Sequence, residues 1–132
     1  MRILIVALLL CLAGPAWAQS GIGLLSTPMN VATLGVTNSG VTLVVSPQGA
    51  GIKVRVLGFF LATDRENQIT MQDNAPTPVT CTGRMTLATG AFANGPVAPP
   101  GWVCETTVNR GVTLNLRNAG IVGGTLMWQQ AQ

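Results

Sequence analysis

The sequence predicts an all-β protein: a single antiparallel β-sandwich or jelly-roll-like domain of about eight strands. Three observations lead to this prediction. Apolar and polar residues alternate with a period of two in several short runs, as in half-buried strands. Clusters of turn-forming residues separate these runs, and no segment has a convincing helical period. Charged residues make up only 8% of the chain, while Thr, Asn, Gly and Val are abundant, which suits sheets better than exposed helices.

The first 18 residues have the three parts of a secretory signal. Arg2 supplies a positive charge, residues 3–13 are almost entirely apolar, and Ala16-Trp17-Ala18 forms a small-x-small cleavage site. A membrane anchor would need roughly 20 apolar residues, and this run is shorter. A lipoprotein is disfavoured because Cys11 lies inside the apolar run. We therefore expect cleavage near Ala18 and an exported protein (periplasmic, extracellular or virion-associated), with no membrane span in the mature chain.

Residues 19–30 follow the signal and are expected to form an extended arm or a loose first strand, and residues 31–132 the sandwich. Alternating apolar residues predict half-buried strands, and their runs are 52–56, 68–72, 84–88 and 112–117. The run 56–61 is apolar at every position except a glycine, which predicts a central strand covered on both faces. On the other strands, the outward positions are mostly Thr, Asn, Gln and Arg, so no hydrophobic stripe is expected on the surface.

Turn-forming residues lie between these runs, at 38–40, 46–49, 64–67 and 109–111. The last of them, Asn109-Arg110-Gly111, is short enough to predict a hairpin. Residues 91–101 contain three prolines and two glycines, which predict an exposed loop. Gly123-Gly124 lies within the last expected strand and predicts a bulge or a close backbone approach.

Two cysteines remain after the signal, Cys81 and Cys104. Because export permits oxidation, we expect them to form a disulfide, worth about 3 kcal/mol in the chain-entropy model. Buried free thiols are the alternative. A metal site is not expected, because the chain has no histidine and no Cys-x-x-Cys spacing.

The residue types that most catalytic sites need are missing. Without histidine, neither a Ser-His-Asp nor a Cys-His arrangement can form, and tyrosine is absent as well. Asp64, Glu66, Asp73 and Asn74 lie in expected turns whose spacing matches no established calcium loop, so solvated side chains are expected there. We therefore predict no enzyme and no cofactor.

Charge and aromatic residues bear on the partner. The six basic residues after position 18 are scattered singly, against four acids, so the basic stripe of a nucleic-acid-binding protein is missing. Trp102 and Trp128 lie on or beside expected strands. Either could be a ligand platform, as in a sugar-binding module, although a core or interface position is commoner for tryptophan.

Two regions of the sequence carry a family resemblance. The first is the block 50–62, AGIKVRVLGFFLA; the second comprises Thr82-Gly83-Arg84-Met85, Pro99-Pro100-Gly101-Trp102, residues 111–116 and residues 123–128. Together they resemble small β-sandwich virion or decoration-like proteins of tailed bacteriophages and prophage-like loci, over about residues 50–128. The resemblance implies a structural module with no catalytic residues to carry over. The signal peptide, Cys81 and Cys104 depart from the usual pattern of that group.

The sequence thus predicts a non-catalytic structural or interaction protein, a phage-type β-sandwich that assembles on a virion or an extracellular surface structure. A protein partner or self-assembly is expected. The alternative is a secreted or periplasmic binding module for a glycan, using Trp102 or Trp128 and the loop 91–101.

Overall fold

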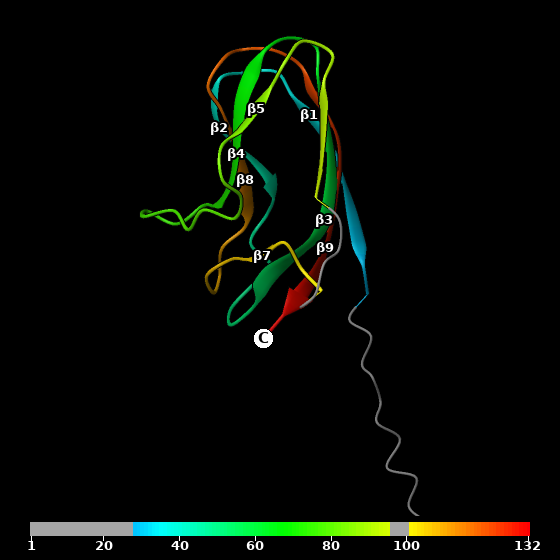
Figure 1. Cartoon of the computed structure of the whole chain (residues 1–132). Coiled ribbons are helices and arrows are strands. Elements are labelled where there is room, and N and C mark those ends of the chain that lie inside the picture. Colours follow the sequence, from blue (N-terminus) through cyan, green and yellow to red (C-terminus); the bar gives the residue numbers. More distant parts are fainter. Residues whose placement is uncertain (1–27, 96–100) are drawn as a thin grey trace, which may run out of the picture.

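The computed structural model describes residues 28–95 and 101–132, and these form two antiparallel sheets packed face to face (Figure 1). They contain nine strands and no helix, which confirms the predicted all-β sandwich. The predicted signal peptide and all but the last three residues of the predicted arm lie outside the described residues.

We call the larger sheet "sheet A" and the smaller one "sheet B". Sheet A has the order β1 (Asn30–Val36), β9 (Val122–Ala131), β3 (Lys53–Thr63) and β6 (Phe92–Gly95), and β7 (Cys104–Glu105) also pairs with β3. Both β6 and β7 lie along the edge of β3 that faces away from β9. Sheet B has the order β2 (Gly40–Val45), β8 (Val112–Leu116), β4 (Asn67–Asp73) and β5 (Met85–Leu87).

The core lies between the two sheets and is built by the predicted alternation. The largest apolar side chains that are fully buried are Leu61, Ile69, Met71, Leu114, Leu116 and Leu126. Removing a side chain of this size from water is worth about 1.5–3 kcal/mol, so this one layer supplies most of the driving force for folding. The predicted strands at 52–56, 68–72, 84–88 and 112–117 all contribute to it.

Strand β3 contains a β-bulge between Val56 and Gly58, where its register against β9 shifts. Because the bulge adds one residue, Val56 and Phe59 both face the core although they are three positions apart. Phe60 then points outward and is 45% exposed. The prediction that residues 56–61 are covered on both faces was therefore wrong, since part of that apolar run lies on the surface.

Gly124 lies in β9 where the backbones of β9 and β3 approach closely. Its φ is +146°, and a β-carbon there would collide with the carbonyl oxygen of Phe60. The pairing of β9 with both neighbours continues through this position without a shift. The predicted close backbone approach is confirmed, whereas the bulge lies on the partner strand.

The segment 109–111 is not a hairpin, contrary to the sequence prediction. The strand before it, β7, belongs to sheet A, and the strand after it, β8, belongs to sheet B. Asn109, with φ 62°, accepts a hydrogen bond from the Gly51 N–H at 2.7 Å, which holds this segment against the turn before β3. These turn residues therefore lie where the chain passes from sheet A to sheet B.

The first part of the expected loop 91–101 is also a strand. Residues 92–95 form β6 and pair with β3 from Phe59 to Ala62. Residues 96–100 lie outside the described part of the chain. The sequence suggested a loop because its prolines and glycines concentrate toward the end of this segment.

Candidate functional site

Cys81 and Cys104 form the predicted disulfide bond. Cys81 follows β4, and its N–H donates to the carbonyl of Met71 in sheet B at 2.8 Å. Cys104 begins β7 and pairs with Val56 in sheet A. The disulfide therefore links the edges of the two sheets, and we call this region "the disulfide edge".

Beside the disulfide edge, four side chains form a connected cluster. Glu105 accepts a hydrogen bond from Lys53 at 2.7 Å and another from Arg55. The Arg55 guanidinium also lies 4.3 Å from the centroid of the Trp102 ring, a cation–π contact. The hydrogen bond from Lys53 is the main reason why the pKa of Glu105 lies below its usual value; burial opposes this, and Arg55 adds to it.

This cluster bears on the expected role of Trp102 as a ligand platform. A sugar ring stacks on an open indole face, and here Arg55 already covers one face of the ring. Trp128 is half-buried and packs against the core, opposite Val56 in the sheet. Neither tryptophan is a fully exposed platform.

Trp102→Ala is expected to lower the free energy of unfolding by about 1–2 kcal/mol, because the variant loses the contact with Arg55 and the apolar area of a half-buried ring. Urea unfolding followed by circular dichroism would measure it. Trp102→Phe keeps an aromatic ring under Arg55 and should recover most of the loss. An unchanged midpoint in Trp102→Ala would show that the ring has no structural role.

The expected solvated turns are found for two acids and not for the third. Asp64 and Glu66 are exposed, and Asp64 accepts a hydrogen bond from the Ile121 N–H at 2.8 Å. Asp73 is fully buried, so the prediction for this residue was wrong. In residues 28–95 and 101–132, no three His, Cys, Asp or Glu side chains lie close enough together to hold a metal ion.

Four donors surround the carboxylate of Asp73 and offset the cost of burying it. One oxygen accepts from the N–H groups of Val79 at 2.8 Å and Ala75 at 3.2 Å. The other accepts from the Thr107 hydroxyl at 2.7 Å and the Thr107 N–H at 3.2 Å. Burial raises the pKa of Asp73, but these hydrogen bonds together outweigh it and hold the pKa below its usual value. Asp73 therefore fastens two loops to the end of β4.

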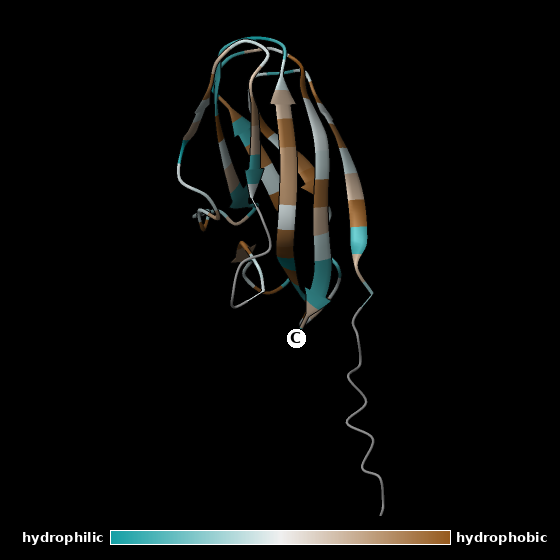
Figure 2. Ribbon diagram, turned by 45° about the vertical axis from the view of Figure 1, so that its right-hand side comes forward, coloured by the Kyte–Doolittle hydropathy of each residue, from teal (hydrophilic) through white to brown (hydrophobic). Residues whose placement is uncertain are grey.

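The outer face of sheet A carries exposed apolar side chains, contrary to the expectation of no hydrophobic stripe. Phe60 and Phe92 stack with ring centroids 5.8 Å apart and an angle of 25° between the rings. Phe92 is 65% exposed. Further across the same face, Val31 of β1, which is 60% exposed, lies opposite Met127 of β9. In Figure 2, β3 and β9 are brown or pale along most of their length, and teal lies toward the C-terminal end of β9.

Two edge strands on this molecule lack the usual protection. Among the described residues, β1 pairs only with β9, and β2 pairs only with β8. Neither β1 nor β2 contains a charged residue or a proline. Val41 and Leu43 of β2 are 59% and 47% exposed. Charged residues or proline commonly prevent an edge strand from pairing with another chain. Because β1 and β2 have neither, their edges are open to such pairing.

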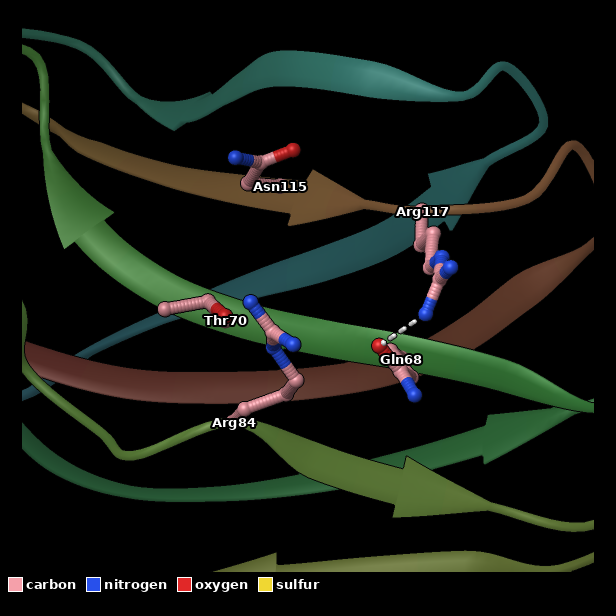
Figure 3. A pocket seen from close by; sticks show the side chains of 5 residues that line it. All are labelled: Gln68, Thr70, Arg84, Asn115 and Arg117. Carbon is pink, nitrogen blue, oxygen red and sulfur yellow. Dashed lines mark hydrogen bonds between the residues drawn. The ribbon is translucent and has the colours of Figure 1, made fainter.

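On the outer face of sheet B, Val41 and Leu43 of β2 are apolar, but the region over β4 is polar and hollowed (Figure 3). A recess of about 420 Å³ lies over β4, and we call it "the polar recess"; its lining residues are Gln68, Thr70, Arg84, Asn115 and Arg117. Arg117 donates to the side-chain oxygen of Gln68 at 3.0 Å. Thr70 and Asn115 lie opposite each other on β4 and β8.

Sequence reasoning missed the polar recess and the apolar face for physical reasons. Arg84 and Arg117 are far apart in the sequence, and only the placement of β4 between β5 and β8 brings them to one site. The sequence offered one indication of this site: Arg84 and Arg117 each occupy an outward-facing position in an alternating run. The bulge in β3 concealed the outward direction of Phe60, and Phe92 lay in a segment expected to be a loop.

Comparisons with known proteins add little about function. No family model matches the chain, and no curated protein matches it. One similar solved structure is described by the words "Bacillus endospore appendages form a novel family of disulfide-linked pili", with 14% identity, 80% of this chain and 87% of that chain covered, and a TM-score of 0.47. A likeness this distant transfers no function. In the part of the chain that the structure describes, no helix is long and apolar enough to cross a membrane.

Proposed function

We propose that this chain is a non-catalytic, exported structural module that associates with further copies of itself through the outer face of sheet A. The observation that carries the proposal is the stacked pair Phe60–Phe92 on a surface that also holds Val31 and Met127. Exposed apolar surface of this kind is costly in water, and a second copy of the same face would cover it.

Other features of the molecule support association. The uncharged edges of β1 and β2 allow strands of neighbouring copies to pair. The low content of charged residues weakens the repulsion between copies. The disulfide between Cys81 and Cys104 is expected to persist in an oxidising compartment outside the cytoplasm, which is where the predicted signal peptide would direct the chain. Assembly on a virion, which the phage-type resemblance implies, is the finer form of this proposal.

The double variant Phe60→Thr/Phe92→Thr is expected to weaken self-association by at least about tenfold, because two exposed aromatic side chains leave the contact. Threonine keeps a high propensity for strands, so the fold should persist. Sedimentation velocity over a concentration series of the protein from Gln19 onward would measure the association, and circular dichroism would verify the fold.

The matched control is Val41→Thr/Leu43→Thr, which removes two exposed apolar side chains from sheet B and leaves the outer face of sheet A intact. This control should associate as the unmodified protein does. If the control dissociates and Phe60→Thr/Phe92→Thr does not, the contact runs along the β2 edge and our choice of face is wrong. An unmodified protein that stays monomeric at millimolar concentration would end the self-association proposal.

A further inference from the structure

Two arginine side chains approach β4, an inner strand of sheet B, from opposite sides. Arg84 extends from the segment just before β5, and Arg117 from the end of β8, and both reach over β4 (Figure 3). Arg117 bonds to the uncharged amide of Gln68, and within residues 28–95 and 101–132 neither arginine has an ion pair. The polar recess thus gathers two positive charges, and none of its lining residues is acidic.

The carboxylates of this molecule are engaged elsewhere or lie outside the lining. Asp73 is buried with four donors, and Glu105 is held by Lys53 and Arg55. Asp64 accepts from a backbone N–H in the turn after β3. Glu66 is exposed, two residues before Gln68, and forms no ion pair with the described residues. Converging like charges without a counter-charge are unfavourable, and an anion between them would relieve this.

The remaining lining residues indicate what kind of anion fits. Gln68, Thr70 and Asn115 supply amide and hydroxyl groups that both donate and accept hydrogen bonds. No lining residue is aromatic, so a nucleobase would find no ring to stack on in the recess. A hydrated ligand rich in hydroxyl groups, with a negative charge for the two guanidinium groups, matches this chemistry.

We propose that the polar recess binds an anionic polysaccharide, with Arg84 and Arg117 on a carboxylate or sulfate group and Gln68, Thr70 and Asn115 on sugar hydroxyls. The volume of about 420 Å³ falls in the range of about 300–1,000 Å³ typical of small-ligand sites, so one or a few sugar units would occupy it. This inference goes beyond the proposed self-association, which uses the opposite sheet, and it moves the expected glycan site away from Trp102 and Trp128.

The test is isothermal titration calorimetry of the protein from Gln19 onward with polygalacturonate oligosaccharides at physiological salt. We expect Arg84→Gln/Arg117→Gln to weaken binding by about tenfold or more, since both charge-assisted contacts are lost. The control, Arg65→Gln/Arg110→Gln, removes the same number of charges outside the recess and should retain most of the affinity. Equal losses in both variants would mean that net charge alone attracts the polymer, and the site would be rejected.

Additional titrations separate other ligand sources. Neutral dextran should not bind, whereas heparin oligosaccharides should bind at the same arginines if sulfate is accepted as well as carboxylate. Binding of single-stranded oligodeoxynucleotides as tightly as polygalacturonate would overturn the assignment to a glycan. Absence of any heat with both acidic glycans would overturn it too. Because Phe60→Thr/Phe92→Thr should leave these titrations unchanged, failure of the self-association proposal is distinguishable from failure of this one.

Discussion

Replacing Cys81 and Cys104 together with alanine is expected to lower the free energy of unfolding by about 3 kcal/mol. The bond closes a loop over a sequence separation of 23 residues, and its removal restores the conformational entropy of that loop to the unfolded chain. Since a domain of this size is stable by only about 5–15 kcal/mol, the loss is a large share of the total. Urea unfolding monitored by circular dichroism would measure it.

Reduction of the unmodified protein provides the control for this prediction. In a reducing agent, the unmodified protein should approach the stability of Cys81→Ala/Cys104→Ala, and the variant itself should not respond to the agent. The effect should be strongest at the disulfide edge, where β7 has only two residues and, within the described part of the chain, pairs only with β3. A loss below about 1 kcal/mol would show that the hydrogen bonds of β7 and its neighbours suffice without the disulfide.

Asp73→Asn is expected to destabilise the protein by about 2–3 kcal/mol, although the side chain keeps its shape. The amide oxygen of the new asparagine can still accept from the N–H groups of Val79 and Ala75. Its NH2 group, however, then faces the N–H and hydroxyl of Thr107, which are donors. A buried donor is left without an acceptor. The matched control is Asp64→Asn, where the carboxylate is exposed and a change within about 1 kcal/mol is expected.

The pH dependence of stability gives a second readout of Asp73. Its pKa in the folded protein lies below the ordinary value of 3.8, so the folded state binds this proton more weakly than the unfolded chain does. The stabilisation is therefore complete well above pH 3.8 and is lost as pH falls through that value toward the folded pKa. Asp73→Asn should flatten the acid limb of the stability curve between about pH 5 and 2.

Glu105 makes the same kind of contribution, so the acid limb should not disappear entirely in Asp73→Asn. Its pKa lies below the ordinary value of 4.5, chiefly because of Lys53. Adding Glu105→Gln to Asp73→Asn should flatten the slope further. If Asp73→Asn left the slope between pH 5 and 2 unchanged, the hydrogen bonds to its carboxylate would not favour the ionised form.

Local patterns predicted the parts of this fold that depend on neighbours in sequence. Alternation located β3, β4, β5 and β8, because each has one face toward the core. The pairing of Cys81 with Cys104 followed from there being two cysteines after the predicted signal peptide. The burial of Asp73 was not predictable in this way, because its partner Thr107 comes from a loop 34 residues away.

The surfaces of the two sheets depended on long-range pairing and therefore escaped prediction. One inserted residue, Leu57, reverses the faces of the rest of β3, and alternation alone does not reveal where such an insertion lies. The polar recess likewise depends on the neighbours of β4 in sheet B. A sequence gives the period of each strand, but the order of strands in a sheet arises from tertiary packing.

The opposition of the two outer faces has a consequence for valency. Copies that meet through the outer face of sheet A would turn their polar recesses away from each other, toward opposite sides of the pair. One glycan chain could not easily occupy both recesses at once, so the gain in avidity along a single chain would be small. Two separate glycan chains could each occupy one recess, and the pair of protein copies would then cross-link them. The expected product is a cross-linked network of glycan and protein, and not a single glycan chain covered with protein.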